Sequence, residues 1–327
     1  MLSGVLYSIS KDDDVRKTIV DTPGSVELAT RLWLFQDAVP IPSSVDIPVG
    51  TAALDSILRV ADRPTLDRVL KTAGGKPDQV AQLALTRLRT EGHKIQIEGF
   101  RTAVYTDILC QFSRPARHPL RHAILIAGGI PTVTKILVTV SSQINSTGNP
   151  MLLDAVVALF GYLRNCLEST DGFTWVSQSV QAGLLTAFVG CSPHVSNLDR
   201  EDREMILSIF KDVLPRYLVY RSVIRTISTA LRTIFKTVSV GQVSNSVAKD
   251  VWKRFTDLAE ERMMVEAQAA AWKGKATICD NANVSFPLVE RIQVSHFFLH
   301  SASKSIRRTT SANVQHAAAP TTAPKVH

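Results

Sequence analysis

Four glycines, each placed between two apolar runs, are the feature that most constrains the fold of this chain. They are Gly24, Gly75, Gly129 and Gly183, and they lie 51, 54 and 54 residues apart. On both sides of each glycine, apolar residues recur at three- and four-residue steps, which is the spacing of one face of an α-helix. Glycine is typical of such a break because the residue after a helix often needs a positive φ. The spacing predicts an all-α fold, an armadillo/HEAT-like α-solenoid of paired helices.

The helical body is expected to cover residues 1–272. Residues 37–50, 90–98 and 141–150 are rich in Pro, Gly, Ser or Asn, or poor in apolar residues, and are predicted to be connectors. Further helices are predicted over 201–214, 215–236 and 245–272. The first helix is expected to begin near Ser10 to Asp13, where a capping residue precedes acidic residues of the first turn. Residues 1–10 look like the end of a preceding helix, so we expect an upstream repeat to be missing.

The amino-acid composition of the chain changes after Trp272. Residues 273–284 are expected to form a linker, and residues 285–327 a divergent, largely disordered basic tail, because Ala, Thr, Ser and Pro dominate from residue 301 onward.

Cysteine usage indicates a reduced intracellular protein. The chain has four cysteines, which are Cys110, Cys166, Cys191 and Cys279, and none of them forms a C-x-x-C pair. Three of them lie in apolar stretches that are predicted to be helical, where a free cysteine behaves as a small buried hydrophobe. We therefore expect the cytoplasm or the nucleus, and not secretion.

The sequence predicts neither a signal peptide nor a membrane span. The segment before Lys11 and the three aspartates that follow it is too short to contain the apolar region of a signal peptide. The most hydrophobic stretch, residues 124–140, contains two glycines, Pro131 and Lys135, and is shorter than a spanning helix requires.

Positive charge is concentrated in two segments. The chain carries a net charge of +8. Residues 213–249 contain six bases and no acid, and residues 285–327 contain five bases and one acid, which leaves −2 elsewhere. At 100° per residue, four of these bases form one stripe on a helix, Arg221, Arg225, Arg232 and Lys236. The stripe is a candidate binding site for an acidic partner or nucleic acid, or else a solvated face neutralised by acids of a neighbouring helix.

No motif for catalysis or cofactor binding is present. The sequence lacks G-x-S-x-G, a Walker loop and a dinucleotide fingerprint, so we expect no enzymatic activity and no cofactor. His118 and His122 have the outer spacing of a zinc-protease helix, but Pro119 follows the first histidine, which predicts a helix start instead. Tryptophans and tyrosines at helical spacing, among them Trp33, Trp175, Trp252 and Trp272, are expected in the core.

Three stretches of the sequence resemble a known protein family. Residues 165–178 read NCLESTDGFTWVSQ, residues 214–223 read LPRYLVYRSV and residues 273–281 read KGKATICDN. These strings resemble the helical body of fungal MYND-type zinc-finger proteins, and the likeness runs from near Met1 to Asn281. The resemblance implies a helical body followed by a compact two-zinc finger made from seven cysteines and one histidine, a protein-interaction module.

The finger itself is incomplete in this chain. Cys279 occupies the position of the first zinc ligand, and no cysteine follows it. His296 and His300 have a spacing that can share a metal, but with Cys279 they supply three donors at most, and a tetrahedral zinc site needs four. We expect no metal site here, and zinc only in a longer form with the complete finger. Residues from about 282 onward are expected to come from another reading frame, a retained intron or an alternative exon.

Three functional hypotheses follow from these patterns. The first is a non-enzymatic scaffold that binds an unidentified protein partner along its helical surface, without contact to a membrane. The second is a basic-helix binder of acidic partners through residues 213–249, with nucleic acid as the less favoured ligand. The third is a mis-spliced product of a gene for a zinc-binding MYND-type protein. The sequence leaves the oligomeric state open.

Overall fold

Every regular element that the structure describes is a helix. The computed structural model describes residues 12–38, 47–169, 173–237 and 241–271, and no strand occurs within these ranges. The all-α prediction is therefore confirmed for this part of the chain. Several predictions lie outside the described residues: the helix end in residues 1–10, Trp272, the incomplete finger at 273–284 with Cys279, and the tail at 285–327 with His296 and His300.

The first twelve described α-helices form four successive groups, which we call units 1 to 4. Each unit has a short first helix, a glycine turn, a second helix and a third helix after a connector. Their bounds are α2 Asp13–Asp21, α3 Ser25–Phe35 and α4 Val49–Leu58; α5 Arg63–Thr72, α6 Pro77–Gly92 and α7 Gly99–Ser113; α8 Pro119–Ile126, α9 Gly129–Thr147 and α10 Leu152–Glu168; α11 Thr174–Gln181, α12 Leu184–Cys191 and α13 Arg200–Ser208. Each period thus holds three helices and not the expected pair.

The chain continues beyond unit 4 in helices of a different order. A π-helical turn, η3 Ile209–Val213, extends α13 and leads into α14 Leu214–Tyr217. The helices α15 Arg221–Thr237, α16 Gly241–Ser244 and α17 Lys249–Ala271 follow. The two 3-10 turns are η1 Gln36–Ala38 and η2 Ser192–Asn197.

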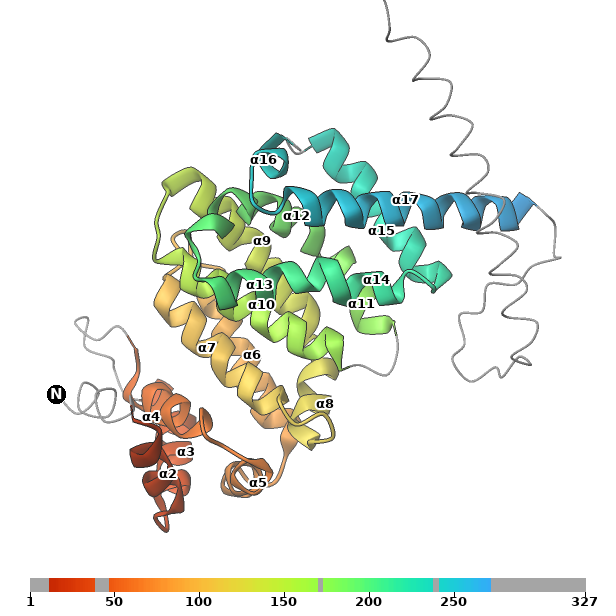
Figure 1. Ribbon diagram of the computed structural model, residues 1–327. Helices are drawn as coiled ribbons and strands as arrows, with labels where there is room; N and C mark the ends of the chain where they lie inside the picture. The colour runs from red at the N-terminus through yellow and green to blue at the C-terminus, as the bar shows by residue number, and fades with distance from the viewer. Residues whose placement is uncertain (1–11, 39–46, 170–172, 238–240, 272–327) are drawn as a thin grey trace, which may run out of the picture. The chain divides into compact units, whose positions relative to one another are not determined.

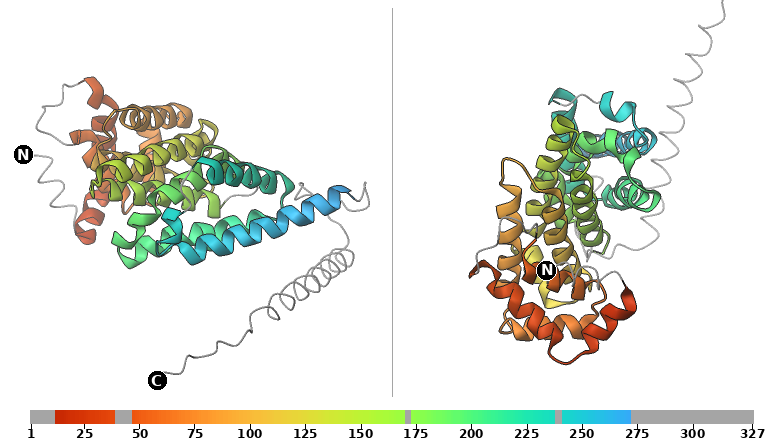
Figure 2. Two further views of the ribbon diagram at one scale, coloured as in Figure 1. Left: turned by 90° about the horizontal axis from the view of Figure 1, so that it is seen from above. Right: turned by 90° about the vertical axis from the view of Figure 1, so that its left-hand side faces the viewer.

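Equivalent helices of successive units lie against one another. The third helices α4, α7, α10 and α13 contact each other in this order, and the second helices α6, α9 and α12 do the same. Figure 1 shows α7, α10 and α13 side by side. The left view of Figure 2 shows α17 at the other end of the described chain, where it packs on α15 and η3. Each unit is therefore buried mainly by its neighbours along the chain.

The glycine turns follow the prediction at three of four positions. Gly24, Gly75 and Gly183 have φ values of +85°, +72° and +109°. In the third unit the turn residue is Gly128, with φ +84°, and not the predicted Gly129. Gly129 is instead the first residue of α9, where an added Cβ would lie 2.5 Å from the hydroxyl of Tyr162. Of these two adjacent glycines, one is required for the turn and the other for close packing.

Several helix starts agree with local sequence signals. The Asp12 carboxylate accepts hydrogen bonds from the backbone N–H groups of Asp14 and Val15, and Asp199 caps α13 in the same way. His118 is the N-cap of α8, and its Nδ1 accepts a hydrogen bond from Leu120 N–H at 3.2 Å. The prediction of a helix start at Pro119 is confirmed.

The predicted connector at 141–150 is largely wrong, because α9 continues through Thr147. Polar side chains in this stretch donate to carbonyls of their own helix, and Asn145 Nδ2 also donates to Gly190 O of α12 at 2.6 Å. This bond to a neighbouring helix supports a helical stretch whose composition favours a loop. The predicted connector at 90–98 is shorter too, since α6 ends at Gly92.

The helices predicted over 201–214 and 215–236 also differ from the structure. The first ends at Ser208 and passes into the π-helical turn, and the second begins only at Arg221, after a break at residues 218–220. Pro215 lies in the first turn of α14, directly after the π-helical turn. The break separates Tyr217 from Tyr220, whose rings are 6.3 Å apart.

Aromatic rings form the core where unit 4 meets α17. Phe188 stacks on Phe210 with ring centroids 3.8 Å apart, and Trp252 of α17 lies 5.8 Å from Phe188. Trp252 and Trp33 are buried, as expected for core tryptophans, and Trp175 is partly buried. The rings fix α17 against the last unit.

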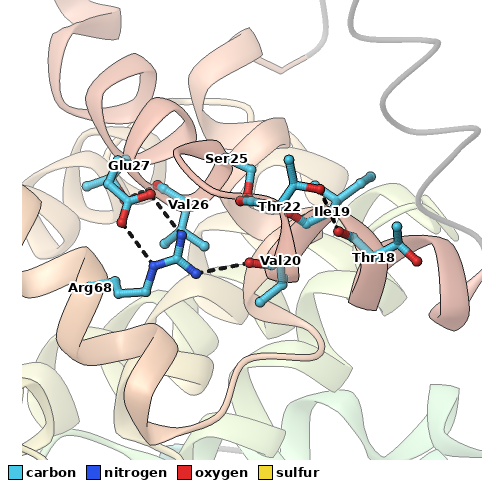
Figure 3. Close-up of polar contacts among 9 residues, drawn as sticks. Thr18, Ile19, Val20, Thr22, Ser25, Val26, Glu27 and Arg68 are labelled. Atoms are coloured by element: carbon cyan, nitrogen blue, oxygen red, sulfur yellow. Dashed lines mark hydrogen bonds and ion pairs between the residues drawn. The ribbon is translucent and has the colours of Figure 1, made fainter.

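Arginines connect the units through backbone carbonyls. Arg68 of α5 donates from Nε and Nη2 to Glu27 of α3, both at 2.9 Å, and from Nη1 to the carbonyl of Val20 at 3.0 Å (Figure 3). Arg89 of α6 similarly donates to Ala127 O, at the end of α8, and to Thr132 of α9. Such side chains fix the angle between successive units because one planar group bonds to several elements.

No single helix among the described residues has the length and hydropathy needed to span a membrane. The pair α8 and α9 meets both criteria only when counted together, and the two helices are bent by 63° at the break between them.

Candidate interaction surfaces

The predicted basic stripe lies on one helix, α15, but half of it is bound to a neighbouring helix. Arg221 Nε donates to Glu266 Oε1 of α17 at 2.7 Å, and Arg225 Nε donates to the same oxygen at 3.0 Å. The Glu266 side chain is 16% exposed, and hydrogen bonds from Arg221 and then Arg225 lower its pKa despite the opposing effect of burial. Glu266 lies outside the acid-free segment, so the charge count of residues 213–249 missed it.

Arg232 and Lys236 form the remainder of the stripe. Both side chains are exposed at the far end of α15, and no ion pair within the described residues involves them. The structure thus separates the four predicted residues into two that hold α15 against α17 and two that face solvent.

Among the described cysteines, Cys166 and Cys191 are buried and Cys110 is partly buried, and all three thiols have raised pKa values. Burial raises the pKa of Cys110 to about 12, that of Cys166 to about 11 and that of Cys191 to about 12. A nucleophilic or metal-binding cysteine needs its thiolate, so these residues are poor candidates for either role. Within the described ranges, no group of three or more His, Cys, Asp or Glu side chains could hold a metal ion.

A second charged surface runs across the third helices. Each of the four units places one aspartate on its third helix, and we call this set the aspartate row: Asp55, Asp107, Asp154 and Asp202. The helices that contain these aspartates contact one another in the order α4, α7, α10 and α13. Successive members are 52, 47 and 48 residues apart, close to the spacing of the glycine turns.

Asp55 and Asp107 share one cation. Arg59 Nη2 lies 3.0 Å from Asp55 Oδ2 and 3.8 Å from Asp107 Oδ2, so the two carboxylates face each other across a single guanidinium. The Asp55 side chain is 9% exposed, and its Oδ1 accepts no hydrogen bond. Burial raises the pKa of Asp55 and outweighs the opposite effect of Arg59.

The row is electrostatically connected from end to end. Burial, then the charge of Asp55, and more weakly Asp154, raise the pKa of Asp107 to about 7, although Arg59 opposes them. Burial first, and then the acids around it, including Asp199 and Asp154, raise the pKa of Asp202. Asp154 is exposed and takes part in no ion pair or hydrogen bond among the described residues. Within the described residues, the ion pairs of the row are those of Arg59 with Asp55 and Asp107, and the charge of Arg16 also acts on Asp55.

Sequence reasoning missed this surface. Each aspartate alone looks like an ordinary polar position of a helix, and two of them, Asp154 and Asp202, lie in a first turn where acids are common. The recurrence at about 50 residues was the one signal that could have revealed the row.

No family model, no curated protein and no solved structure matches this chain.

Proposed function

We propose that this chain is a non-enzymatic scaffold, an armadillo/HEAT-like stack that binds a protein partner along the face formed by its third helices. The observation that carries the proposal is the recurrence of one three-helix unit in which α4, α7, α10 and α13 lie in sequence. Stacks of this kind present one surface built from equivalent positions of every unit, which suits an elongated partner. Three members of the aspartate row, Asp107, Asp154 and Asp202, are partly or fully exposed on these helices, whereas Asp55 is buried.

A site-specific photocrosslinker tests the proposal. It is placed at Gln111 of α7 or Ala158 of α10, each one helical turn from a member of the row, and at Gln82 of α6 as the control position. We expect the same partner to be captured in cells at Gln111 and Ala158 and not at Gln82. Capture confined to Gln82, or no capture at any of the three positions, would overturn the proposal.

The resemblance to fungal MYND-type proteins stays a prediction, because its most specific feature, Cys279, lies outside the described residues. We propose that a zinc finger belongs to a longer form and that the helical body acts with or without it. Sequencing of transcripts across the Cys279 codon tests this point, since a longer form must encode the remaining seven ligands.

The alternative function, binding of acidic partners through residues 213–249, is favoured by the two exposed bases Arg232 and Lys236. The variant with both residues changed to glutamate should lose retention on heparin, and the loss should be greatest at low salt. Unchanged retention would remove this alternative.

A further inference from the structure

We infer that the exposed face of α3 binds an amphipathic helix of another protein, one that has apolar residues on one side and acidic residues beside them. This surface is separate from the face of the third helices, because α3 is the second helix of unit 1 and lies at the end of the stack away from α17 (Figure 1). Three apolar side chains, one arginine and the contacts of equivalent positions in later units support the inference.

The apolar side chains form an exposed stripe along α3. Leu28, Leu32 and Phe35 are 59%, 40% and 68% exposed. They are four and three residues apart, so they lie on one side of the helix, within about 60° of one another. Single exposed apolar residues are normal on a protein surface, but a row of three on one helical face is typical of an interaction site.

Equivalent positions in unit 3 contact a neighbouring helix. Counted from the turn glycine of its unit, the stripe occupies the fourth, eighth and eleventh positions. The fourth position of unit 3 is Thr132, whose hydroxyl accepts a hydrogen bond from Arg89 of α6 at 3.2 Å. The eighth is Ile136, which packs so closely on α6 that a Cβ added to Gly92 would lie 2.5 Å from it. These positions therefore form the contact with the second helix of the preceding unit.

Units 4 and 2 show what the same positions do with and without such a helix. In unit 4 the eleventh position is His194, whose Nε2 lies 3.1 Å from Oδ1 of Asn145 in α9. In unit 2 the fourth and eleventh positions, Gln79 and Thr86, are exposed and polar, and the eighth, Leu83, is partly buried. Unit 2 thus has polar residues where these positions face solvent. Exposed apolar residues at all three positions of unit 1 indicate that a helix covers them.

Arg31 adds a positive charge to this face. It lies on the same side of α3 as the stripe and is exposed, and no ion pair among the described residues involves it. Glu27, one helical turn before it, is bound to Arg68 instead. An acidic residue beside the apolar side of a partner helix would pair with Arg31, whereas a basic helix would be repelled.

The size of the face favours one docked helix over a second copy of this chain. A stable interface between two globular proteins buries about 800 Å² on each partner. A large aromatic side chain has about 150–250 Å² to bury, and the three side chains of the stripe are only about half exposed. A docked helix needs no more than such a row of anchors. In a symmetric pair of α3 helices, the two copies of Arg31 would also lie close together and repel each other.

The experiment uses the full chain and two labelled peptides of identical composition, each held helical by a lactam bridge. One peptide has leucines at i, i+4 and i+7 with a glutamate on either side of them, and the other has its leucines spread around the helix. Fluorescence anisotropy measures both affinities. We expect the first peptide to bind at least about tenfold more tightly, because only its leucines can be buried together.

Two double variants show whether α3 is responsible. L28S/F35S removes the two most exposed side chains of the stripe, and I126S/M264S removes two exposed apolar side chains on α8 and α17. We expect at least about a tenfold loss of affinity for the first peptide in L28S/F35S and none in I126S/M264S. All four residues are exposed, so both variants should fold, and circular dichroism checks this.

A charge exchange tests the role of Arg31. Arg31→Glu should weaken binding of the glutamate peptide several-fold at low salt, and a peptide with lysines in place of the glutamates should bind this variant better than the wild type. Non-specific adsorption to an apolar surface would not show this reversal.

Several outcomes would overturn the inference. They are failure of either peptide to bind, equal binding of the two, equal losses in the two double variants, and a charge exchange without effect. Light scattering provides a further check. If the wild type is a dimer and L28S/F35S is a monomer, a second copy of the chain occupies the face and the inference is wrong. None of these results bears on the partner captured at Gln111 and Ala158, so the scaffold proposal is tested separately.

Discussion

Individual side chains in this protein are strongly affected by their position between helices. The Asp107 side chain is 37% exposed, yet burial of its carboxyl group first, and then the charge of Asp55, raise its pKa to about 7. The same residue on an isolated helix would be an ordinary surface acid. Burial and neighbouring charge, not residue type, determine what it contributes.

The raised pKa predicts a pH-dependent effect of Asp107→Asn. Between pH 4 and pH 7 the unfolded chain has lost its proton at this position while the folded chain retains it, so the folded state binds more protons and stability falls as pH rises. Asparagine removes this dependence. We expect the variant to melt roughly 1–3 °C above the wild type at pH 8, a small gain because solvent screens the side chain. Differential scanning calorimetry from pH 4 to pH 8 measures it, and a gain that does not shrink on acidification would contradict the prediction.

Two glycines in different conformations should respond oppositely to alanine. Gly183 has φ +109°, and an added Cβ would lie 2.8 Å from Val138, so Gly183→Ala should lose roughly 1–2 kcal/mol. Gly161 lies inside α10, where a Cβ would meet only Met205 at 3.9 Å, so Gly161→Ala should gain about 0.5–1 kcal/mol from helix propensity. Urea denaturation measures both, and losses of equal size would show that φ is not the cause.

At the scale of helices, polar connections between units add to the continuous apolar core and help to fix the angle between neighbouring units. Arg68 bonds to α3 and to the end of α2 at the same time, so it links the first helix of unit 2 to the first two helices of unit 1 (Figure 3). Hydrogen bonds from Arg68 lower the pKa of Glu27 to about 2. The bond is therefore retained well into the acid range.

A double-mutant cycle on Glu27 and Arg68 measures this connection. We expect a coupling energy of about 1 kcal/mol at pH 7, with the larger single loss for Arg68→Ala because Val20 O also loses a donor. The folded-state pKa of Glu27 is lowered, so its contribution is complete above about pH 4.5 and disappears as the pH falls toward 2. Coupling unchanged between pH 7 and pH 2.5 would show that the ion pair is not its source.

At the scale of the whole described chain, stability is distributed among neighbours. The third helices of all four units, and the second helices of units 2 to 4, contact their equivalents in adjacent units, so a defect at one end should be felt mainly nearby. The rings of Phe188 in unit 4, Phe210 in η3 and Trp252 in α17 form one cluster at this end of the stack.

Removing one ring tests how far a defect spreads. Trp252 is 5% exposed, so Trp252→Ala should cost about 3–5 kcal/mol through lost burial and the cavity that remains. Hydrogen exchange should accelerate most in α12, η3 and α17 and least in α3 and α4. Val247→Ala, at an exposed position, serves as the control with little effect. Equal acceleration in all helices would indicate a single cooperative unit in place of a stack.

The sequence by itself determined the helical class, the spacing of the glycine turns and several helix starts. These features depend on near neighbours: the 3.6-residue period, the positive φ at Gly24 or Gly183 and the caps at Asp12, His118 and Asp199. Backbone geometry and side-chain hydrogen bonds over four residues encode them directly. The connector predicted at 141–150 failed because a bond from Asn145 to another helix outweighed local composition.

Only the tertiary structure decided how charges 40 to 50 residues apart are combined. It placed Glu266 against Arg221 and Arg225, which halves the basic stripe, and it brought Asp55, Asp107 and Asp154 into one row. The physical reason is that charge interactions depend on distance in space and on burial, neither of which is a property of a short stretch of sequence. The packing of the helices determines both the distances between charges and their burial. It therefore also determines which surface has unbalanced charge available for a partner.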